Sequence, residues 1–345
     1  MKKTTLYILL LIIISLAVTA YIFFAPATAF TEKSKSVVIE LGMTGKEDVA
    51  EIFEKKEIVK NGWAFKLLGD GLNIWGKIKP GKFMIKHNDN LLTIVRMLRN
   101  NHQSEVKLII NKIRTNEDLA KLIGKNFSTD SATAMQFLTN NDSLKQFAID
   151  SNTVVTIIIP NTYSFYWITP LSKIFSKLQS TSDDFWNTDG RNQKAAKMGF
   201  TPKQVYTIGS IVEEETNMLG DKGKIASVYI NRYHKGMNLG ADPTVKFALK
   251  DFTLKRILFQ HLGVQSPYNT YKNKGLPPGP ICTPSVETLD EVLNAPTTDY
   301  LYFVAKPDFS GYSNFSSNFA EHSKYAKQYQ QALNDYLLKK QTKLQ

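Results

Sequence analysis

The sequence is poor in cysteine, with Cys282 as the single one among 345 residues. One cysteine excludes both an intrachain disulfide framework and a zinc cluster built from several thiolates, so Cys282 is expected to be a small buried apolar residue. The five histidines show no metal-ligand spacing and no glycine loop could cradle a phosphate, so neither a metal nor a cofactor is expected. Gly209-Ser210 also lacks the second glycine of a nucleophile elbow.

Disordered, polar low-complexity segments and internal repeats are also missing. With 43% hydrophobic and 11% aromatic residues, the chain has ample material for buried cores, and its length suggests about two domains. The net charge of +12 comes from scattered lysines rather than from a basic run interleaved with aromatics. We therefore expect no nucleic-acid partner, and a basic surface that suits an anionic membrane and cell wall.

One long apolar run stands at the start of the chain. It extends from about Leu6 to Phe24 without a charge, follows Lys2 and Lys3, and as a helix would reach roughly 30 Å, the thickness of a bilayer core. The lysines favour a cytoplasmic N-terminus, so residues 1–24 are predicted to be a single-pass inner-membrane anchor with the remainder in the periplasm. The small residues Ala25–Ala29 leave open a cleaved signal peptide, although the run is longer than a usual signal sequence.

The pattern beyond the anchor predicts an α+β protein. Residues 25–36 are predicted to be a juxtamembrane linker, residues 37–103 a small α+β subdomain, and residues 104–342 a larger mixed α+β domain. Within the larger domain we expect strands at 106–110 and 300–304, helical segments from about 202 to 236 with a break near Gly220, and a C-terminal helix. A proline- and glycine-rich stretch from Gly240 to Pro284 is expected to be mostly loop, with a short helix near 253–262.

The most informative segment is Ile208–Thr216, which contains three consecutive glutamates. At about 100° per residue, Glu215 falls in the apolar sector with Ile208 and Ile211. Glu213 and Glu214 point to the polar side, where we expect simple solvation. A carboxyl on the apolar face has a raised pKa, which a general acid near neutral pH requires. Periodicity alone leaves open that Glu215 pairs with a buried arginine or caps a neighbouring helix.

The loops downstream concentrate aromatic, amide and hydroxyl groups. Such a mixture suits a sugar, which is apolar on its ring faces and polar at its rim, and loops on a rigid scaffold often carry binding groups. Asp242 has an alternative role as the cap of the turn that it forms with Pro243 and Thr244. The candidate substrate-binding residues are Asn231, Asp242, Thr244, Tyr268, Asn269, Thr270 and Tyr271.

These segments together resemble the endolytic murein transglycosylases of the MltG or YceG-like family. The resemblance is ordered over roughly the last 140 residues, is weak between about 120 and 190, and extends to the anchor and to the 37–103 subdomain, which resembles the LysM-like subdomain of that family. One departure is Glu214, where relatives carry lysine or another residue. The matching blocks are Ile208–Thr216, Ile225–Arg232, Asp242–Val245, Tyr268–Tyr271, Gly275–Ile281 and Tyr300–Val304.

The resemblance implies a specific reaction on peptidoglycan. The catalytic glutamate of the family directly precedes threonine, which corresponds to Glu215 here. It would act first as acid and then as base, cleaving the β-1,4 bond between N-acetylmuramic acid and N-acetylglucosamine and leaving a 1,6-anhydro end. The resemblance also implies that such cleavage ends the elongation of nascent glycan strands, and that peptidoglycan synthases are possible partners.

Two other functions stay open from the sequence. A hydrolytic muramidase would need a second carboxylate near Glu215, and its products would be one water heavier. A non-catalytic wall-binding scaffold would rely on the LysM-like subdomain, and the presence of Glu215 together with the whole set of loops argues against it.

Overall fold

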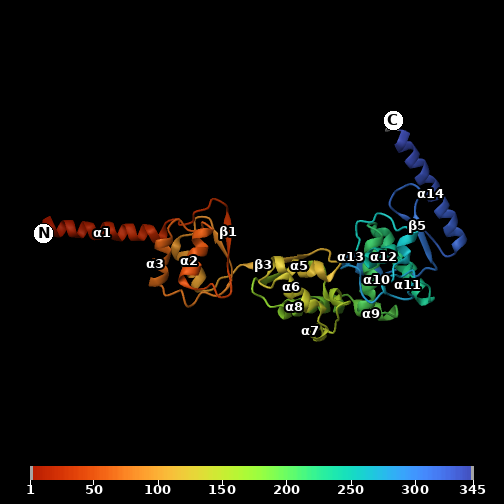
Figure 1. Ribbon diagram of the computed structural model, residues 1–345, viewed down its shortest axis with the longest axis horizontal. Coiled ribbons are helices and arrows are strands. Elements are labelled where there is room, and N and C mark those ends of the chain that lie inside the picture. Colours follow the sequence, from red (N-terminus) through yellow and green to blue (C-terminus); the bar gives the residue numbers. More distant parts are fainter. Residues whose placement is uncertain (1–2, 343–345) are drawn as a thin grey trace. The chain divides into compact units, whose positions relative to one another are not determined.

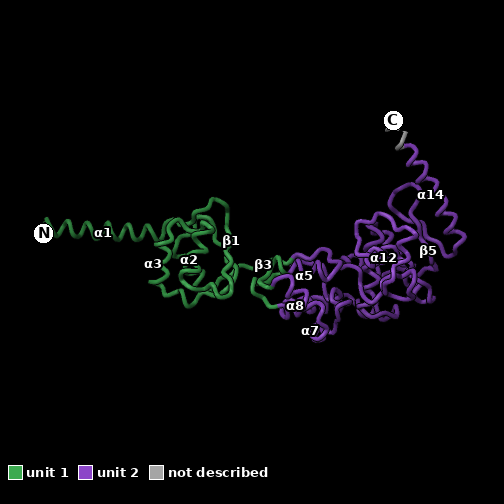
Figure 2. Tube along the Cα trace, viewed as in Figure 1, with its two compact units in different colours: residues 1–108, 124–129, 164–170 green, residues 109–123, 130–163, 171–345 purple. Residues whose placement is uncertain are grey.

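The computed structural model describes residues 3–342 and has a mixed α+β fold (Figure 1). The chain forms two compact units, which Figure 2 distinguishes by colour. Unit 1 contains residues 1–108, 124–129 and 164–170, and unit 2 contains residues 109–123, 130–163 and 171–345.

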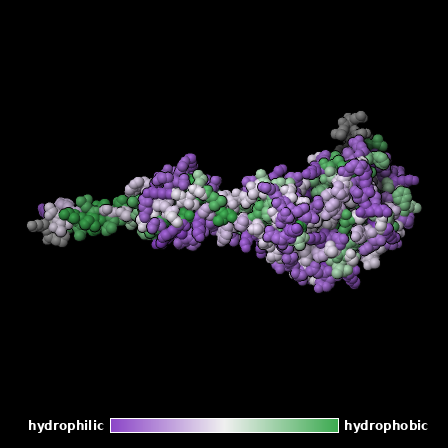
Figure 3. All heavy atoms as spheres, turned by 60° about the horizontal axis from the view of Figure 1, so that its bottom comes forward, coloured by the Kyte–Doolittle hydropathy of each residue, from purple (hydrophilic) through white to green (hydrophobic). Residues whose placement is uncertain are grey.

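Unit 1 begins with the apolar helix α1 (Lys3–Phe24), none of whose residues is buried by protein. Figure 3 shows the hydrophobic surface of this helix. Within the part of the chain that the structure describes, α1 is the one helix long and apolar enough to cross a membrane. The helix therefore agrees with the predicted single-pass anchor, although Lys2 lies outside the described residues.

The rest of unit 1 packs three helices with an antiparallel strand pair. β1 pairs with β2 in a register that places Val37 opposite Phe83. Asn61 and Asn90 accept hydrogen bonds from the first turns of α3 and α4, which fixes where these helices begin. Gly69 leaves room for the Trp75 ring, because a β-carbon there would lie 2.2 Å from it. The elements are β1 (Ser34–Ile39), α2 (Lys46–Lys55), α3 (Gly62–Gly71), β2 (Gly81–Lys86) and α4 (Leu91–Arg99).

The segment 25–36, for which the sequence suggested a linker, is built into unit 1. Ala27 and Phe30 are buried in its core, and the partly buried Ile22 and Phe23 pack against the same core. The backbone N–H of Ala27 donates to the Asp89 carbonyl at 3.0 Å. This short segment mixes small and apolar residues without a helical or strand period, so its burial could not be predicted from the sequence.

Unit 2 is mainly helical. β5 and β6 form an antiparallel pair, and α14 packs against both. Where the sequence predicted a short helix near 253–262, the structure has the short 3-10 helix η2 (Phe259–Gly263). The other elements are α6 (Ser131–Thr139), α7 (Asn141–Lys145), η1 (Val154–Ile157), α8 (Leu171–Asn187), α9 (Arg191–Lys197), α10 (Pro202–Glu215), α11 (Leu219–His234), α12 (Asp242–Leu249), α13 (Val286–Leu293), β5 (Tyr302–Ala305), β6 (Ser313–Ser316) and α14 (Phe319–Thr342).

Three elements take residues from both units. β3 (Glu105–Ile110) pairs with β4 (Asn161–Tyr166), and the helix that follows β3 is α5 (Asn116–Asn126). The observed β3 and β5 agree closely with the predicted strands at 106–110 and 300–304, and the break between α10 and α11 lies at residues 216–218, close to the predicted position.

The core of unit 2 surrounds α10, which packs against α11, α12 and α13. Thr201 and Gln204 form a reciprocal capping box at its start, and Pro202 occupies the first helical turn. Val205, Ile208 and Ile211 are buried in this core. Cys282 is buried beside the same helix, as its apolar character predicted, and its thiol donates to the Ser210 carbonyl.

Candidate active site

Glu215 is the last residue of α10, at the point where the chain leaves the helix. Thr216 is extended, with φ −149°, so the helix stops directly after the glutamate. The preceding turn is anchored in the core by Ile211 and Val212, which are fully buried. Glu215 is thereby fixed on a rigid element while its carboxyl reaches an open pocket.

The pocket has a volume of about 770 Å³ and lies within unit 2. Its walls come from α11, from the loop between α11 and α12, from the Tyr271–Lys274 loop, and from β5 and α14. Such a pocket is large enough for several rings of a small-molecule or polymer ligand. The lining residues are Glu215, Tyr229, Arg232, Gly236, Met237, Asn238, Gly240, Asp242, Tyr271, Lys274, Tyr302, Phe303 and His322.

The surroundings of Glu215 raise its pKa to about 7. Burial is the largest cause, because it disfavours the charged carboxylate, and the negative charge of Asp242 acts in the same direction. The Tyr229 hydroxyl donates a 2.5 Å hydrogen bond to Oε1 of Glu215 and lowers the pKa in part. Glu215 can therefore both donate and accept a proton near neutral pH.

Glu213 and Glu214 are not simply solvated, so that expectation was wrong. Glu213 accepts from Lys222 Nζ at 3.1 Å and from the hydroxyls of Ser285 and Thr288. Burial alone would raise the pKa of Glu213, but these hydrogen bonds outweigh it and the pKa is lowered. A helical wheel assigns a side chain to a face, but it cannot show which neighbouring elements cover that face.

Glu214 has a second set of cationic partners. Its carboxylate accepts from Lys112 Nζ at 2.9 Å and from Arg114 Nη2 at 3.1 Å. Burial raises its pKa, and the two cations more than offset this, so the pKa of Glu214 is also lowered. Of the three glutamates, only Glu215 has a raised pKa. Groups whose surroundings separate their pKa values in this way are typical of acid–base sites.

Asp242 is the second acidic side chain of the pocket. Instead of capping its own turn, its Oδ1 accepts a 2.6 Å hydrogen bond from the Tyr271 hydroxyl. Burial and this hydrogen bond raise the pKa of Tyr271, so its hydroxyl remains a donor at neutral pH. The pocket thus holds two carboxylates, each bound by a tyrosine hydroxyl.

Four of the other candidate residues serve internal hydrogen bonds. Thr244, Asn269 and Thr270 are almost completely buried. The Thr244 and Thr270 hydroxyls lie 2.8 Å apart and tie α12 to the loop that carries Tyr271, while the Asn269 amide donates to carbonyls of its own loop. The Asn231 amide holds the carbonyls of Thr298 and Tyr300. These four residues therefore position the pocket walls, while Asp242 and Tyr271 face the pocket.

Tyr268 lies in a separate, smaller pocket of about 190 Å³, together with Asn116, Phe247 and Lys250. Its ring packs against Phe247, with the two centroids 4.6 Å apart. Burial raises the pKa of Tyr268 to about 12, so the hydroxyl stays protonated. The structure therefore places Tyr268 away from Glu215.

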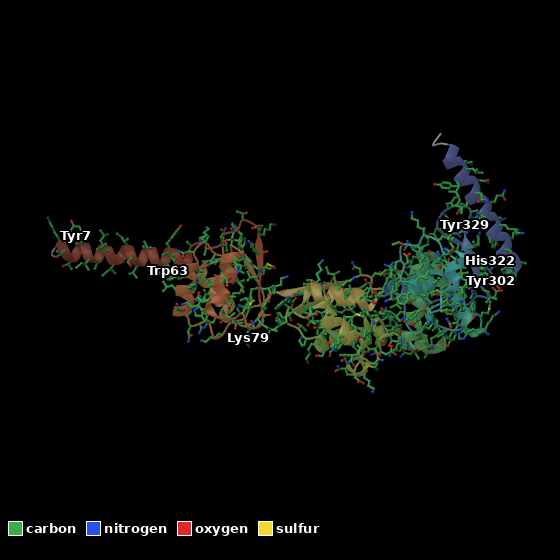
Figure 4. The ribbon with its side chains drawn as sticks, viewed as in Figure 1. Tyr7, Trp63, Lys79, Tyr302, His322 and Tyr329 are labelled. Carbon is green, nitrogen blue, oxygen red and sulfur yellow. The ribbon has the colours of Figure 1, made fainter. Side chains whose placement is uncertain are left out.

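The sequence reasoning missed most of the other pocket residues, among them Tyr229, Arg232, Tyr302 and His322. Tyr229 lies on α11 opposite Glu215, and Arg232 on the same helix donates to the carbonyls of Leu239 and Leu301. Tyr302 of β5 and His322 of α14 stack with centroids 5.2 Å apart, and Figure 4 shows them together. The matching block Ile225–Arg232 could have indicated Tyr229 and Arg232, whereas nothing in the sequence links His322 to the site.

No group of three or more metal-binding side chains occurs among residues 3–342. The acidic pair in the pocket is bound by tyrosines, and the positive charges of Lys246 and Arg232 lower the pKa of Glu215 in part. Acid–base chemistry is therefore what this set of side chains supports.

Comparisons with known proteins agree with one another. A model of the YceG-like family matches residues 37–328. Two relatives bear the name endolytic murein transglycosylase. The one from Bacillus subtilis (strain 168) is 36% identical over 182 residues, and the one from Streptococcus pneumoniae (strain D39 / NCTC 7466) is 30% identical over 152 residues. These alignments cover 52% and 43% of this chain but only 48% and 27% of the relatives, so the chain spans less than half the length of each.

A solved structure extends the likeness to the fold. The crystal structure of a YceG-like protein from Listeria monocytogenes has a TM-score of 0.56 and 26% sequence identity. The superposition covers 85% of this chain and 99% of the Listeria chain. With the family match spanning most of the sequence, this chain belongs to the YceG-like family.

Proposed function

We propose that this protein is an endolytic lytic transglycosylase of peptidoglycan glycan strands, with Glu215 as its proton-transferring residue. The observation that carries the proposal is the Glu215 carboxyl, which faces a 770 Å³ pocket and has a pKa raised to about 7. The names of the two relatives support the same activity, and the aromatic and polar lining of the pocket suits a sugar chain.

In the proposed mechanism the protonated Glu215 donates its proton to the glycosidic oxygen between N-acetylmuramic acid and N-acetylglucosamine. The bond from this oxygen to C1 of the muramoyl ring breaks, and the Glu215 carboxylate then removes the proton from the C6 hydroxyl. The C6 oxygen bonds to C1 and closes a 1,6-anhydro ring, which leaves Glu215 protonated as at the start. No water is consumed, so one carboxyl can perform both steps.

The neighbouring groups support each of these steps. The Tyr229 hydrogen bond holds the Glu215 carboxyl in one orientation and stabilises the carboxylate formed after proton donation. The Asp242 carboxylate lies in the same pocket, where its negative charge favours the positive charge that develops at C1. Asp242 could instead direct a water molecule to C1, so hydrolysis is the competing reaction. The products of hydrolysis are one water heavier than those of transglycosylation.

The decisive experiment is mass spectrometry of purified glycan strands treated with wild type, Glu215→Gln and Glu214→Gln. We expect 1,6-anhydro ends from the wild type and a loss of about a hundred- to ten-thousand-fold in rate for Glu215→Gln, since glutamine keeps the shape but cannot transfer a proton. Glu214→Gln is the matched control, because its carboxylate binds Lys112 and Arg114 outside the pocket. Turnover by Glu215→Gln near the wild-type rate would exclude Glu215 as the proton-transferring residue. Products with reducing ends in place of 1,6-anhydro ends would show that the reaction is hydrolysis and not transglycosylation.

We also propose that α1 holds the protein in the inner membrane with unit 2 in the periplasm, where peptidoglycan lies. The length and apolar character of α1 support the anchor, and the lysines that precede the apolar run in the sequence support the orientation. Protease added to intact spheroplasts should digest unit 2 from outside, and protection of unit 2 until the membrane is lysed would reverse the orientation.

A further inference from the structure

A second cavity of about 370 Å³ adjoins the pocket of Glu215, and we name it the proline-loop pocket. Lys274 lines both cavities, so the two are neighbours across a single residue. One wall is the loop Gly275–Pro278, and the opposite wall comes from the first two turns of α10 and the end of α11.

Helix α11 runs along both cavities. Tyr229 lines the pocket of Glu215, and Tyr233, one turn further along, lines the proline-loop pocket. Residues four apart lie on the same face of a helix, about 6 Å apart along its axis. A ligand that lies along this face of α11 therefore contacts both tyrosines in succession.

The lining of the proline-loop pocket has the chemistry of a sugar site. Tyr233 and Leu276 are half-buried and provide an apolar surface. Beside it lie the Gln204 amide, whose oxygen accepts from the Thr201 backbone, and the Thr207 hydroxyl, which donates to the Lys203 carbonyl and can still accept a hydrogen bond. A pyranose ring has the same division, with apolar ring faces and hydroxyls around its rim. Lys203 and Lys274 add positive charge, which favours the carboxylates carried by muramic acid residues.

The pocket is held in shape by contacts on both sides. The Tyr233 ring packs against Phe200 with centroids 5.0 Å apart. On the loop side, Gly279 approaches the backbone so closely that a β-carbon there would lie 2.1 Å from the Asn152 carbonyl oxygen. A preformed pocket of this kind binds its ligand without a large ordering cost.

We propose that the proline-loop pocket is a subsite for a further saccharide residue of the same glycan strand, beyond the residues that bind at Glu215. This inference rests on the proposed function, because it takes the glycan strand as the ligand of the neighbouring pocket. It gives the enzyme a preference for strands long enough to extend from Glu215 past Tyr233, since a strand that ends within the pocket of Glu215 lacks this contact.

The test compares kcat/KM for short and long glycan strands that carry no peptides, in the full-length protein. Wild type should cleave long strands faster than short ones. Tyr233→Leu, which keeps apolar volume against Phe200 but removes the aromatic face, should reduce the ratio of the two kcat/KM values by roughly fivefold, which corresponds to about 1 kcal/mol. Tyr233→Phe keeps the ring and should retain most of the ratio, and Lys235→Ala, exposed at the end of the same helix, should leave it unchanged.

A second variant protects the test against a folding defect in Tyr233→Leu. Pro278 is exposed at the rim of the pocket, so Pro278→Trp should fill the cavity without removing a core contact, and it too should lower the ratio. A preserved ratio in a folded Tyr233→Leu and in Pro278→Trp would overturn the subsite, as would a length preference seen only with strands that carry peptides. A wild type that cleaves all lengths equally would also overturn the subsite alone, whereas a wild type that cleaves none would refute the proposed function.

Discussion

At the scale of single residues, Glu213, Glu214 and Glu215 show how surroundings separate chemically identical groups. Lys222, Lys112 and Arg114 neutralise the first two carboxylates, so their pKa values are lowered despite burial. Glu215 has a tyrosine hydroxyl and a neighbouring carboxylate instead of a cation in direct contact, and its pKa rises to about 7. Near neutral pH, Glu215 is therefore the one of the three glutamates that can both donate and accept a proton.

The raised pKa of Glu215 also has a cost in stability at alkaline pH. The unfolded chain ionises this group near its ordinary value of 4.5 and the folded protein near 7, so stability is lost as the pH rises through this interval. We expect Glu215→Gln to be more stable than wild type at pH values above about 7, by about 1–3 kcal/mol. The difference should vanish below the unfolded pKa, and urea unfolding at several pH values will measure it. A stability difference between the two proteins that does not change with pH would contradict the raised pKa of Glu215.

The Tyr229 hydroxyl should tune the pH dependence of the reaction. Its own pKa is raised well above the ordinary value, first by burial, so it stays a donor throughout. Tyr229→Phe removes a hydrogen bond that lowers the pKa of Glu215. Because the reaction starts from protonated Glu215, activity falls as the pH rises through this pKa. We therefore expect the alkaline limb of kcat/KM to move to higher pH, with a rate about tenfold lower because the carboxyl is less well oriented.

The matched control for this variant is Tyr206→Phe. Tyr206 is also fully buried, and its hydroxyl donates to the Ile158 carbonyl, away from the pocket. Its removal should lower stability without moving the alkaline limb. An unshifted limb in Tyr229→Phe would show that this tyrosine has only a structural role.

At the scale of elements, the site depends on how α10, α11 and α13 are held together. Lys222 of α11 is buried and donates both to Glu213 of α10 and to the Thr288 hydroxyl of α13. Thr288 in turn donates to Glu213, so one polar cluster joins the three helices. This cluster ties the end of α10 to its two neighbours, in addition to the buried contacts of Ile211 and Val212 that position Glu215.

Glu213→Gln should consequently weaken the fold more than the chemistry. The change leaves the buried Lys222 ammonium without its counter-charge, and breaking such a pair costs about 3–5 kcal/mol. Urea unfolding will show the loss, while the folded fraction should keep most of its activity. Glu287→Gln, on the exposed side of α13, is the control and should change stability by about 0.5 kcal/mol or less. Equal stability of the two variants would show that the cluster contributes little.

At the scale of the whole molecule, α1 leads directly into the packed part of unit 1. The bridges from Pro26 to Asn90 and from Thr28 to Val59 join the segment after α1 to the body of the unit. The exposed Trp63 lies on α3, which contacts α1, and it is labelled in Figure 4. A bilayer that contains α1 would therefore lie close to Trp63, a side chain suited to the membrane interface.

The burial of the 26–30 segment leads to a prediction about processing. Cleavage near Ala29 would remove the buried residues Ala27 and Thr28. The hydrogen bond that the Thr28 hydroxyl accepts from the Asn88 backbone would be lost with them. We expect the N-terminus to be retained, and N-terminal sequencing of the membrane fraction will test this. A chain that begins at Thr31 should also unfold at a lower temperature than one that begins at Ala25, by several degrees, because it lacks the buried Ala27 and Phe30. A mature protein that begins near Phe30 with undiminished stability would contradict both expectations.

The sequence by itself determined the features that depend on local periodicity and on short ordered blocks. Continuous apolar character predicted α1, short apolar segments predicted β3 and β5 but not β4 or β6, and the helical period placed Glu215 on the apolar side of α10. The ordered blocks around Glu215 identified the family, because their spacing is a property of the chain alone.

Only the tertiary structure decided which side chains share the pocket. It brought Tyr229, Asp242 and, from 107 residues further along the chain, His322 to the pocket of Glu215. It turned Asn269 inward to hold its own loop and Thr270 inward to hold the start of α12. It also covered Glu213 and Glu214 with cations from other segments. The physical reason is that burial and charge pairing arise from contacts between distant segments, which no local pattern encodes.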